Sequence, residues 1–180
     1  MRFEDVFNTA QIASIYAEID ACDEREVDHE QGRLMIHGMR TSASVNETVR
    51  NLVNEETGLN LYIHGGPLCA VYSSEFGEPN LVPHYDGDDN MIVFDYQLKS
   101  NTSWGIGVDL GVEELVDNSA IAFDPNETIH WRPHKKFEEG ERIIMLFFRL
   151  FDVSQIERVD RRLDRKDPAF DAVRAFRDSL

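Results

Sequence analysis

The sequence predicts a mainly β protein with flanking helices, of the α+β class, whose strands form a sandwich or barrel. Two observations predict this class. From about Gly58 onward the chain consists of short apolar runs bounded by Gly, Pro, Asn and Asp, as is typical of strands joined by turns. Near both ends of the chain, apolar residues recur at helical spacing instead. Helices are therefore expected to bracket a β core.

Two amphipathic helices are expected before the β core. The first spans residues 8–22 and has apolar residues at helical spacing, namely Ile12, Ile15, Tyr16 and Ile19. The second begins at Ser44, because Glu47 lies three residues on and completes a capping-box pattern; its apolar positions are Val45, Val49, Leu52 and Val53. A short strand at 33–37 is expected between the helices.

The β core and a helical C-terminus complete the predicted elements. Seven apolar runs are expected to be strands, at 68–72, 81–85, 91–98, 104–110, 120–123, 128–131 and 143–151. Two charged amphipathic helices are expected at 153–162 and, after Asp167-Pro168, at 169–180. We therefore expect a single domain, 1–180, with a helical support at 1–60, the β core at 61–151 and C-terminal helices at 152–180.

Composition disfavours several classes of partner. The 180 residues, of which 42% are hydrophobic, can bury one substantial core. A net charge of −16 opposes binding to nucleic-acid phosphates and to anionic membranes, and no apolar run approaches the roughly 20 residues that span a bilayer. The acidic N-terminal stretch does not resemble a signal peptide, and Cys22 and Cys69 are too few for a disulfide framework. We expect a cytoplasmic protein that binds neither nucleic acid nor membrane; its oligomeric state is open.

Three residues form a candidate metal site. His84 and Asp86 lie two apart, so in a strand their side chains share a face. His130 follows later, at the end of another predicted strand. Two imidazoles and one carboxylate can occupy one face of a six-coordinate Fe(II) and leave three positions open. An isolated His-x-Asp is more often a solvated surface pair, so the order of the downstream residues matters.

A buried cation is expected near these residues. Gly140-Glu141-Arg142 opens the apolar run 143–148, where an arginine can point inward beside alternating apolar neighbours. A guanidinium buried there requires an anionic partner.

At this point the residues match a family. The stretch 83–150 resembles the Fe(II)/2-oxoglutarate-dependent oxygenases, in particular their compact prolyl-4-hydroxylase-like branch. The matching motifs are His84-Tyr85-Asp86, the distal His130 followed by Pro133, and Gly140-Glu141-Arg142. One segment departs from the family pattern: Trp104-Gly105-Ile106-Gly107-Val108 stands where Gly-Gly-x-Leu is common. The resemblance implies a double-stranded β-helix core, also described as a jelly roll or cupin-like fold.

The resemblance also implies an activity and a set of site residues. His84, Asp86 and His130 would be the catalytic metal ligands for Fe(II), and Arg142 would pair with the far carboxylate of the co-substrate 2-oxoglutarate, to which Tyr72 would add a hydroxyl. With dioxygen, such an enzyme hydroxylates a substrate and releases succinate and CO2. The substrate is expected to be a small molecule, an amino acid or a protein side chain.

Several alternatives stay open at this stage. His134 rivals His130, and Arg149 rivals Arg142, although Arg149 has the opposite parity along its strand and should face the other side. Tyr72 is equally well explained as a barrel-wall residue, and Arg132 belongs to a basic patch that is interpreted as a solvated loop. The competing functions are a cupin-type metalloenzyme that does not use 2-oxoglutarate and a non-catalytic metal-binding module of the same fold.

Overall fold

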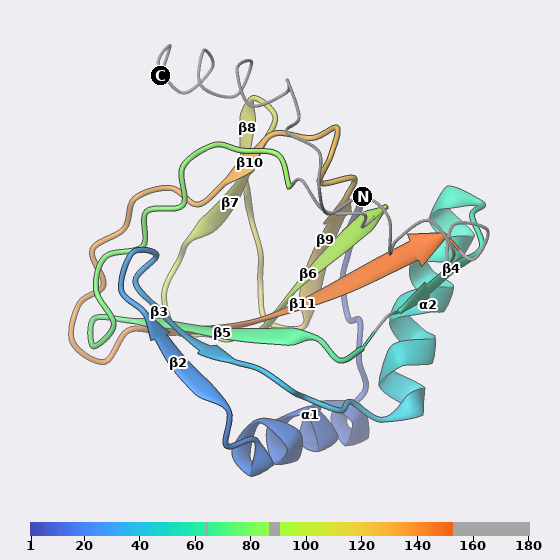
Figure 1. The fold of residues 1–180 in the computed structure, drawn as a ribbon, viewed down its shortest axis with the longest axis horizontal. Helices are drawn as coiled ribbons and strands as arrows, with labels where there is room; N and C mark the ends of the chain where they lie inside the picture. The colour runs from blue at the N-terminus through green and yellow to red at the C-terminus, as the bar shows by residue number, and fades with distance from the viewer. Residues whose placement is uncertain (64, 87–90, 153–180) are drawn as a thin grey trace, which may run out of the picture.

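The computed structural model describes residues 1–63, 65–86 and 91–152, and Figure 1 shows their arrangement. Two helices lie against one face of a large sheet, and a smaller sheet lies beyond its other face. The predicted helices at 153–162 and 169–180 lie outside the described residues.

The two N-terminal helices form as predicted, but the second has a different start. Helix α1 (Thr9–Ala21) begins with a capping box, in which the side chains of Asn8 and Gln11 each accept a hydrogen bond from the other's backbone N–H. Helix α2 (Ala43–Thr57) has Ser42 as its N-cap, so the capping box predicted for Ser44 and Glu47 is wrong. The hydroxyl of Ser44 instead contacts that of Ser42, because Ser44 already lies in the first turn.

The strands form two antiparallel sheets. The large sheet has the order β1-β9-β6-β11-β5-β3-β2, with β4 also pairing with β11, and the small sheet has the order β10-β7-β8. The strands are β1 (Arg2–Phe3), β2 (Arg25–Asp28), β3 (Arg33–Ile36), β4 (Leu61–Ile63), β5 (Leu68–Ser73), β6 (Ile92–Ser100), β7 (Gly105–Val108), β8 (Gly111–Glu114), β9 (Ser119–Phe123), β10 (His130–Trp131) and β11 (Arg142–Asp152). Strand β8 was not predicted because all four of its residues are exposed and it lacks an apolar face.

The predicted strand at 81–85 reduces to a single bridge. His84 and His130 exchange two backbone hydrogen bonds, of 3.1 and 3.0 Å, and this bridge attaches the segment to the small sheet. Pro83 carries no backbone N–H and cannot donate to a longer ladder. With this segment included, the chain passes back and forth between the two sheets from β5 to β11, with the β7–β8 hairpin lying wholly in the small sheet, as in a jelly roll. The predicted double-stranded β-helix core with N-terminal helices is confirmed.

Strand β11 separates the two apolar layers of the protein. Ile144, Leu146, Phe148 and Leu150 pack in the cluster that contains the buried faces of α1 and α2. Ile143 and Met145 pack in the other cluster, between the sheets, together with Ile106 of β7. Odd-numbered residues of β11 therefore face the space between the sheets, and even-numbered residues face the helices.

The ring of Trp131 in β10 packs closely on Gly107 in β7, so a larger residue at position 107 is expected to destabilise the protein. A Cβ added to Gly107 would lie 1.9 Å from Cε2 of Trp131, whereas one added to Gly111 would have its nearest neighbour at 3.9 Å. Forcing extra volume into a packed position costs about 1–3 kcal/mol. We expect Gly107→Ala to lower the free energy of unfolding by that amount in urea titrations followed by circular dichroism, and Gly111→Ala to change it far less. Equal losses in the two variants would contradict the packing of Trp131 on Gly107.

None of the helices among the described residues is both long enough and apolar enough to cross a membrane.

Candidate metal centre and its cavity

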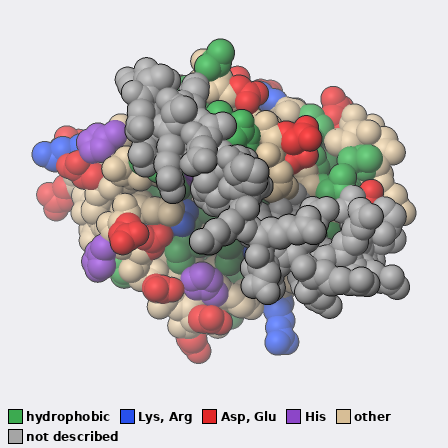
Figure 2. Space-filling view, turned by 45° about the horizontal axis from the view of Figure 1, so that its top comes forward, with side chains coloured by type: hydrophobic (Ala, Val, Ile, Leu, Met, Phe, Trp, Pro, Cys, Tyr) green, Lys and Arg blue, Asp and Glu red, His purple; other side chains and the backbone are tan. Residues whose placement is uncertain are grey.

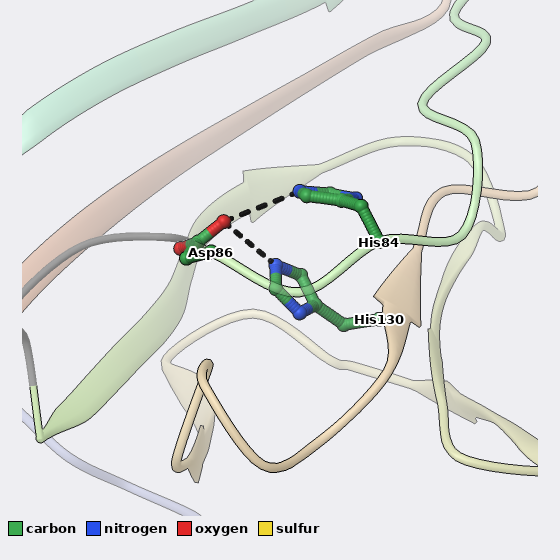
Figure 3. A group of neighbouring side chains, drawn as sticks. All are labelled: His84, Asp86 and His130. Carbon is green, nitrogen blue, oxygen red and sulfur yellow. Dashed lines mark ion pairs between the residues drawn. The ribbon is translucent and has the colours of Figure 1, made fainter. Parts of the chain in front are cut away.

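His84, Asp86 and His130 come together at one point of the structure. One ligand atom from each residue lies within 4.8 Å of the others. Oδ1 of Asp86 is 3.2 Å from Nε2 of His84 and 3.4 Å from Nε2 of His130, and Figure 3 shows the two imidazoles turned toward this carboxylate. The bridge between His84 and His130 sets the spacing of the two rings, whose centroids are 4.3 Å apart.

Backbone carbonyls fix the orientation of both imidazoles. Nδ1 of His84 lies 2.8 Å from the carbonyl oxygen of Val82, and Nδ1 of His130 lies 3.1 Å from that of Thr128. A carbonyl oxygen can only accept, so each Nδ1 carries a proton and donates it, and Nε2 is the ring atom that faces the site. When Nε2 is protonated it donates to Asp86, and when that proton leaves, its lone pair can bind a metal. Metal-ligating histidines are commonly held in this way. The three donors thus fit a divalent metal such as Fe(II), which two imidazoles and a carboxylate suit well.

The local electrostatics also favour a metal-binding carboxylate. Partial burial alone would raise the pKa of Asp86, but hydrogen bonds from His130 and His84 and their charges outweigh it and lower that pKa well below its usual range. Burial acts to lower the pKa of His130, yet the hydrogen bond and charge of Asp86 raise it overall. Asp86 is therefore ionised at neutral pH and ready to bind a cation.

The rival histidine lies elsewhere. The side chain of His134 is 62% exposed, and its Nε2 lies 2.8 Å from Oε2 of Glu78. His130 is 7% exposed and joins His84 and Asp86. The structure therefore places His130, the preferred candidate, beside the other two residues, and His134 outside the group.

The three residues line a cavity of about 290 Å³ between the sheets. Its wall also carries three arginines, Arg33, Arg132 and Arg149, and a further carboxylate, Asp95. Arg142 is not part of this wall: it is exposed at the start of β11, so its predicted inward position is corrected. It shares the parity of Ile144 and Leu146, which face the helices. Arg149 has the parity of Ile143 and Met145 and faces the cavity.

An ion pair that the sequence does not predict lies in the cavity wall. Arg132, for which a solvated loop is the expectation, has a side chain only 4% exposed, and its Nη2 lies 3.5 Å from Oδ2 of Asp95, which is 6% exposed. The guanidinium also donates to the carbonyl of Gly105 at 3.3 Å and lies 5.2 Å from the ring centroid of Trp104. Burial raises the pKa of Asp95 to about 6, although the charge of Arg132 acts to lower it. The position of Arg132, two residues from His130, is the signal that could have placed it on the cavity side.

Tyr72 and Arg33 form a second polar group in the wall. Tyr72 is 1% exposed and packs edge-on against Trp104. Nη1 of Arg33 lies 3.5 Å from the Tyr72 hydroxyl oxygen, and Nε of Arg33 lies 3.1 Å from Oδ2 of Asp28. Tyr72 thus lines the cavity, and its contact with 2-oxoglutarate stays a prediction; the presence of Arg33 in this wall was not predicted.

The fold is similar to those of several solved structures. Residues covering 93% of this chain superimpose on 86% of the non-heme α-ketoglutarate-dependent epimerase SnoN from nogalamycin biosynthesis, with a TM-score of 0.67 and 11% identity. For HygX from Streptomyces hygroscopicus, with nickel and 2-oxoglutarate bound, the coverage is 85% and 82%, the TM-score 0.63 and the identity 8%. For a prolyl hydroxylase from Trichoplax adhaerens, in complex with a hypoxia-inducible-factor peptide, these values are 92%, 87%, 0.55 and 12%. No protein-family model and no curated protein sequence matches the chain.

Proposed function

We propose, starting from the fold that this chain shares with 2-oxoglutarate- and iron-dependent oxygenases, that it is itself such an enzyme and hydroxylates a small molecule, an amino acid or a protein side chain. The observation that carries the proposal is the His84–Asp86–His130 group, with both Nε2 lone pairs directed by backbone carbonyls. This donor set leaves half of an octahedral metal's positions for other ligands.

The protein's part in the reaction is to hold and place the reactants. Bound Fe(II), 2-oxoglutarate and dioxygen would supply the oxidising chemistry, with succinate and CO2 as co-products. The chain would contribute fixed ligand geometry, an ionised Asp86 and a cavity walled by apolar side chains such as Phe123 and Ile106. Such walls limit the access of water to the reacting groups.

Charge balance assigns the far carboxylate of 2-oxoglutarate to Arg149. Among the described residues, Arg33 pairs with Asp28 and Arg132 with Asp95, whereas Arg149 makes no ion pair. Fe(II) with one aspartate leaves one positive charge, and Arg149 adds a second; a dicarboxylate neutralises both. Arg149 also lies in the same cross-strand row as Val93 and Phe123, and the Phe123 ring is 4.9 Å from that of His130. Arg149 and the three candidate metal ligands line the same cavity, which is why we place the far carboxylate of a chelated 2-oxoglutarate at Arg149.

A comparison of two arginines on one strand tests this assignment. An anaerobic titration of the Fe(II) protein with 2-oxoglutarate should produce a weak visible charge-transfer band, and succinate should form in air. We expect Arg149→Ala to raise the 2-oxoglutarate concentration at half-saturation by a factor of ten or more, because a charge-assisted hydrogen bond contributes about 1.5–3 kcal/mol. Arg142→Ala is the matched control and should titrate like the unaltered protein.

If Arg142→Ala weakened 2-oxoglutarate binding and Arg149→Ala did not, Arg142 would be the residue that binds the far carboxylate. Absence of both the band and succinate would refute the oxygenase proposal. If the charge-transfer band is absent but the protein still turns over a substrate, the cupin-type alternative is favoured.

A further inference from the structure

The cavity has a second polar group that the co-substrate leaves unused. Arg33 and Tyr72 face each other in the register of β3 and β5, and Tyr72 lies opposite Ile143 of β11. Arg149 is six residues further along β11, so at about 3.3 Å per residue the backbone positions of Arg149 and Ile143 are about 20 Å apart along the strand. A single carboxylate cannot contact both ends, so 2-oxoglutarate anchored at Arg149 leaves Arg33 and Tyr72 free for another molecule.

The donors of this second group are arranged for an oxyanion. Asp28 holds Nε of Arg33 at 3.1 Å and fixes the plane of the guanidinium, whose remaining N–H groups stay available. The Tyr72 oxygen accepts from Nη1 of Arg33 at 3.5 Å, so its own O–H proton is uncommitted in this contact. Donors held in place before binding lose less conformational entropy when a ligand arrives.

The surroundings restrict the anion to a single charge. Figure 2 shows acidic side chains spread over the described part of one face, with few basic ones among them. Arg33 also borders a neighbouring surface hollow whose rim includes Glu26 and Glu30. Arg33 is also already paired with Asp28, so a phosphate or another polyanion would be repelled by these carboxylates, whereas a single carboxylate adds only one charge and can accept the N–H groups of Arg33 that Asp28 leaves available.

We propose that the substrate is a small monocarboxylate, held by Arg33 and Tyr72 at one end of the cavity while the C–H bond to be oxidised lies at the metal group. This inference rests on the proposed oxygenase function and adds the substrate's chemical class. Arg33 and Tyr72 are thereby substrate-binding residues, distinct from the metal ligands and from Arg149.

The test uses a matched acid and amide as probes. Hexanoate and hexanamide are titrated by calorimetry into the anaerobic Fe(II) protein saturated with 2-oxoglutarate. We expect hexanoate to bind at least tenfold more tightly than hexanamide, since only the acid offers a charge to the guanidinium. Arg33→Gln should remove this preference, and Tyr72→Phe, which keeps the ring packed on Trp104, should weaken hexanoate several-fold. Arg142→Gln, at an exposed arginine, should change nothing.

Three results would overturn the proposal. They are equal binding of hexanoate and hexanamide, no binding of hexanoate, and a raised half-saturation for 2-oxoglutarate in Arg33→Gln or Tyr72→Phe. The last would place the co-substrate at this end of the cavity and leave the oxygenase function standing. If the charge-transfer band itself fails to appear, the oxygenase function falls, and the same two titrations on the protein alone still decide whether Arg33 and Tyr72 bind a carboxylate.

Discussion

His130→Ala is expected to weaken Fe(II) binding by a factor of 100 or more, whereas His134→Ala should bind Fe(II) like the unaltered protein. His130 supplies one of only three protein ligands in the proposed site, and even residues that merely orient such ligands contribute about 10–100-fold to metal affinity. The measurement is an anaerobic calorimetric titration with Fe(II), with thermal unfolding of each apo variant as a check on folding.

His134 is a matched control because it lies four residues away and is bound to Glu78 on the surface. A loss of affinity in His134→Ala with none in His130→Ala would mean that the metal is held differently from the arrangement in Figure 3. A loss in both variants would indicate that the 130–134 segment acts as a whole, and would contradict the assignment of a single ligand.

Arg132→Met is expected to be the most destabilising of the cavity substitutions. It removes the partner of the buried Asp95 and leaves an uncompensated carboxylate, for which the typical cost is about 3–5 kcal/mol. Urea unfolding at pH 8 should show this loss. Arg132→Met combined with Asp95→Asn should recover much of it, because the second change removes the buried charge.

The loss should also depend on pH, with a definite sign. Burial raises the pKa of Asp95 to about 6 from 3.8, so the carboxyl's contribution to stability is present below the lower value and is lost as the pH rises through about 6. Without Arg132, which acts to lower that pKa, it rises further. Arg132→Met should therefore be less destabilising at pH 5, where Asp95 can be protonated, than at pH 8. A loss that is equal at both pH values and persists in the double variant would show that Arg132 matters through packing alone.

Much of the fold was predictable because its signals are local. The helical spacing of Ile15 and Ile19, and of Val45, Val49 and Val53, reflects faces that are buried in the structure. Turn residues delimit the strands of the β core, and the order of His84, Asp86 and His130 was enough to single out the three residues that meet. Each of these signals depends only on a few neighbouring positions.

The tertiary structure alone decided which charged side chains enter the cavity. In β11 the four residues from Ile143 to Leu146 are all buried, so alternation along the strand does not reveal which face meets the helices and which meets the small sheet. Arg142 and Arg149 have opposite parity in either case, and only the packing of α1 and α2 against the even-numbered positions turns Arg149 inward. Likewise Arg132 and Asp95 are 37 positions apart in the sequence, and their pairing depends on how the two sheets face each other. The sequence by itself thus determined most of the elements and the three candidate metal ligands, whereas the packing of the layers determined the charges that surround them.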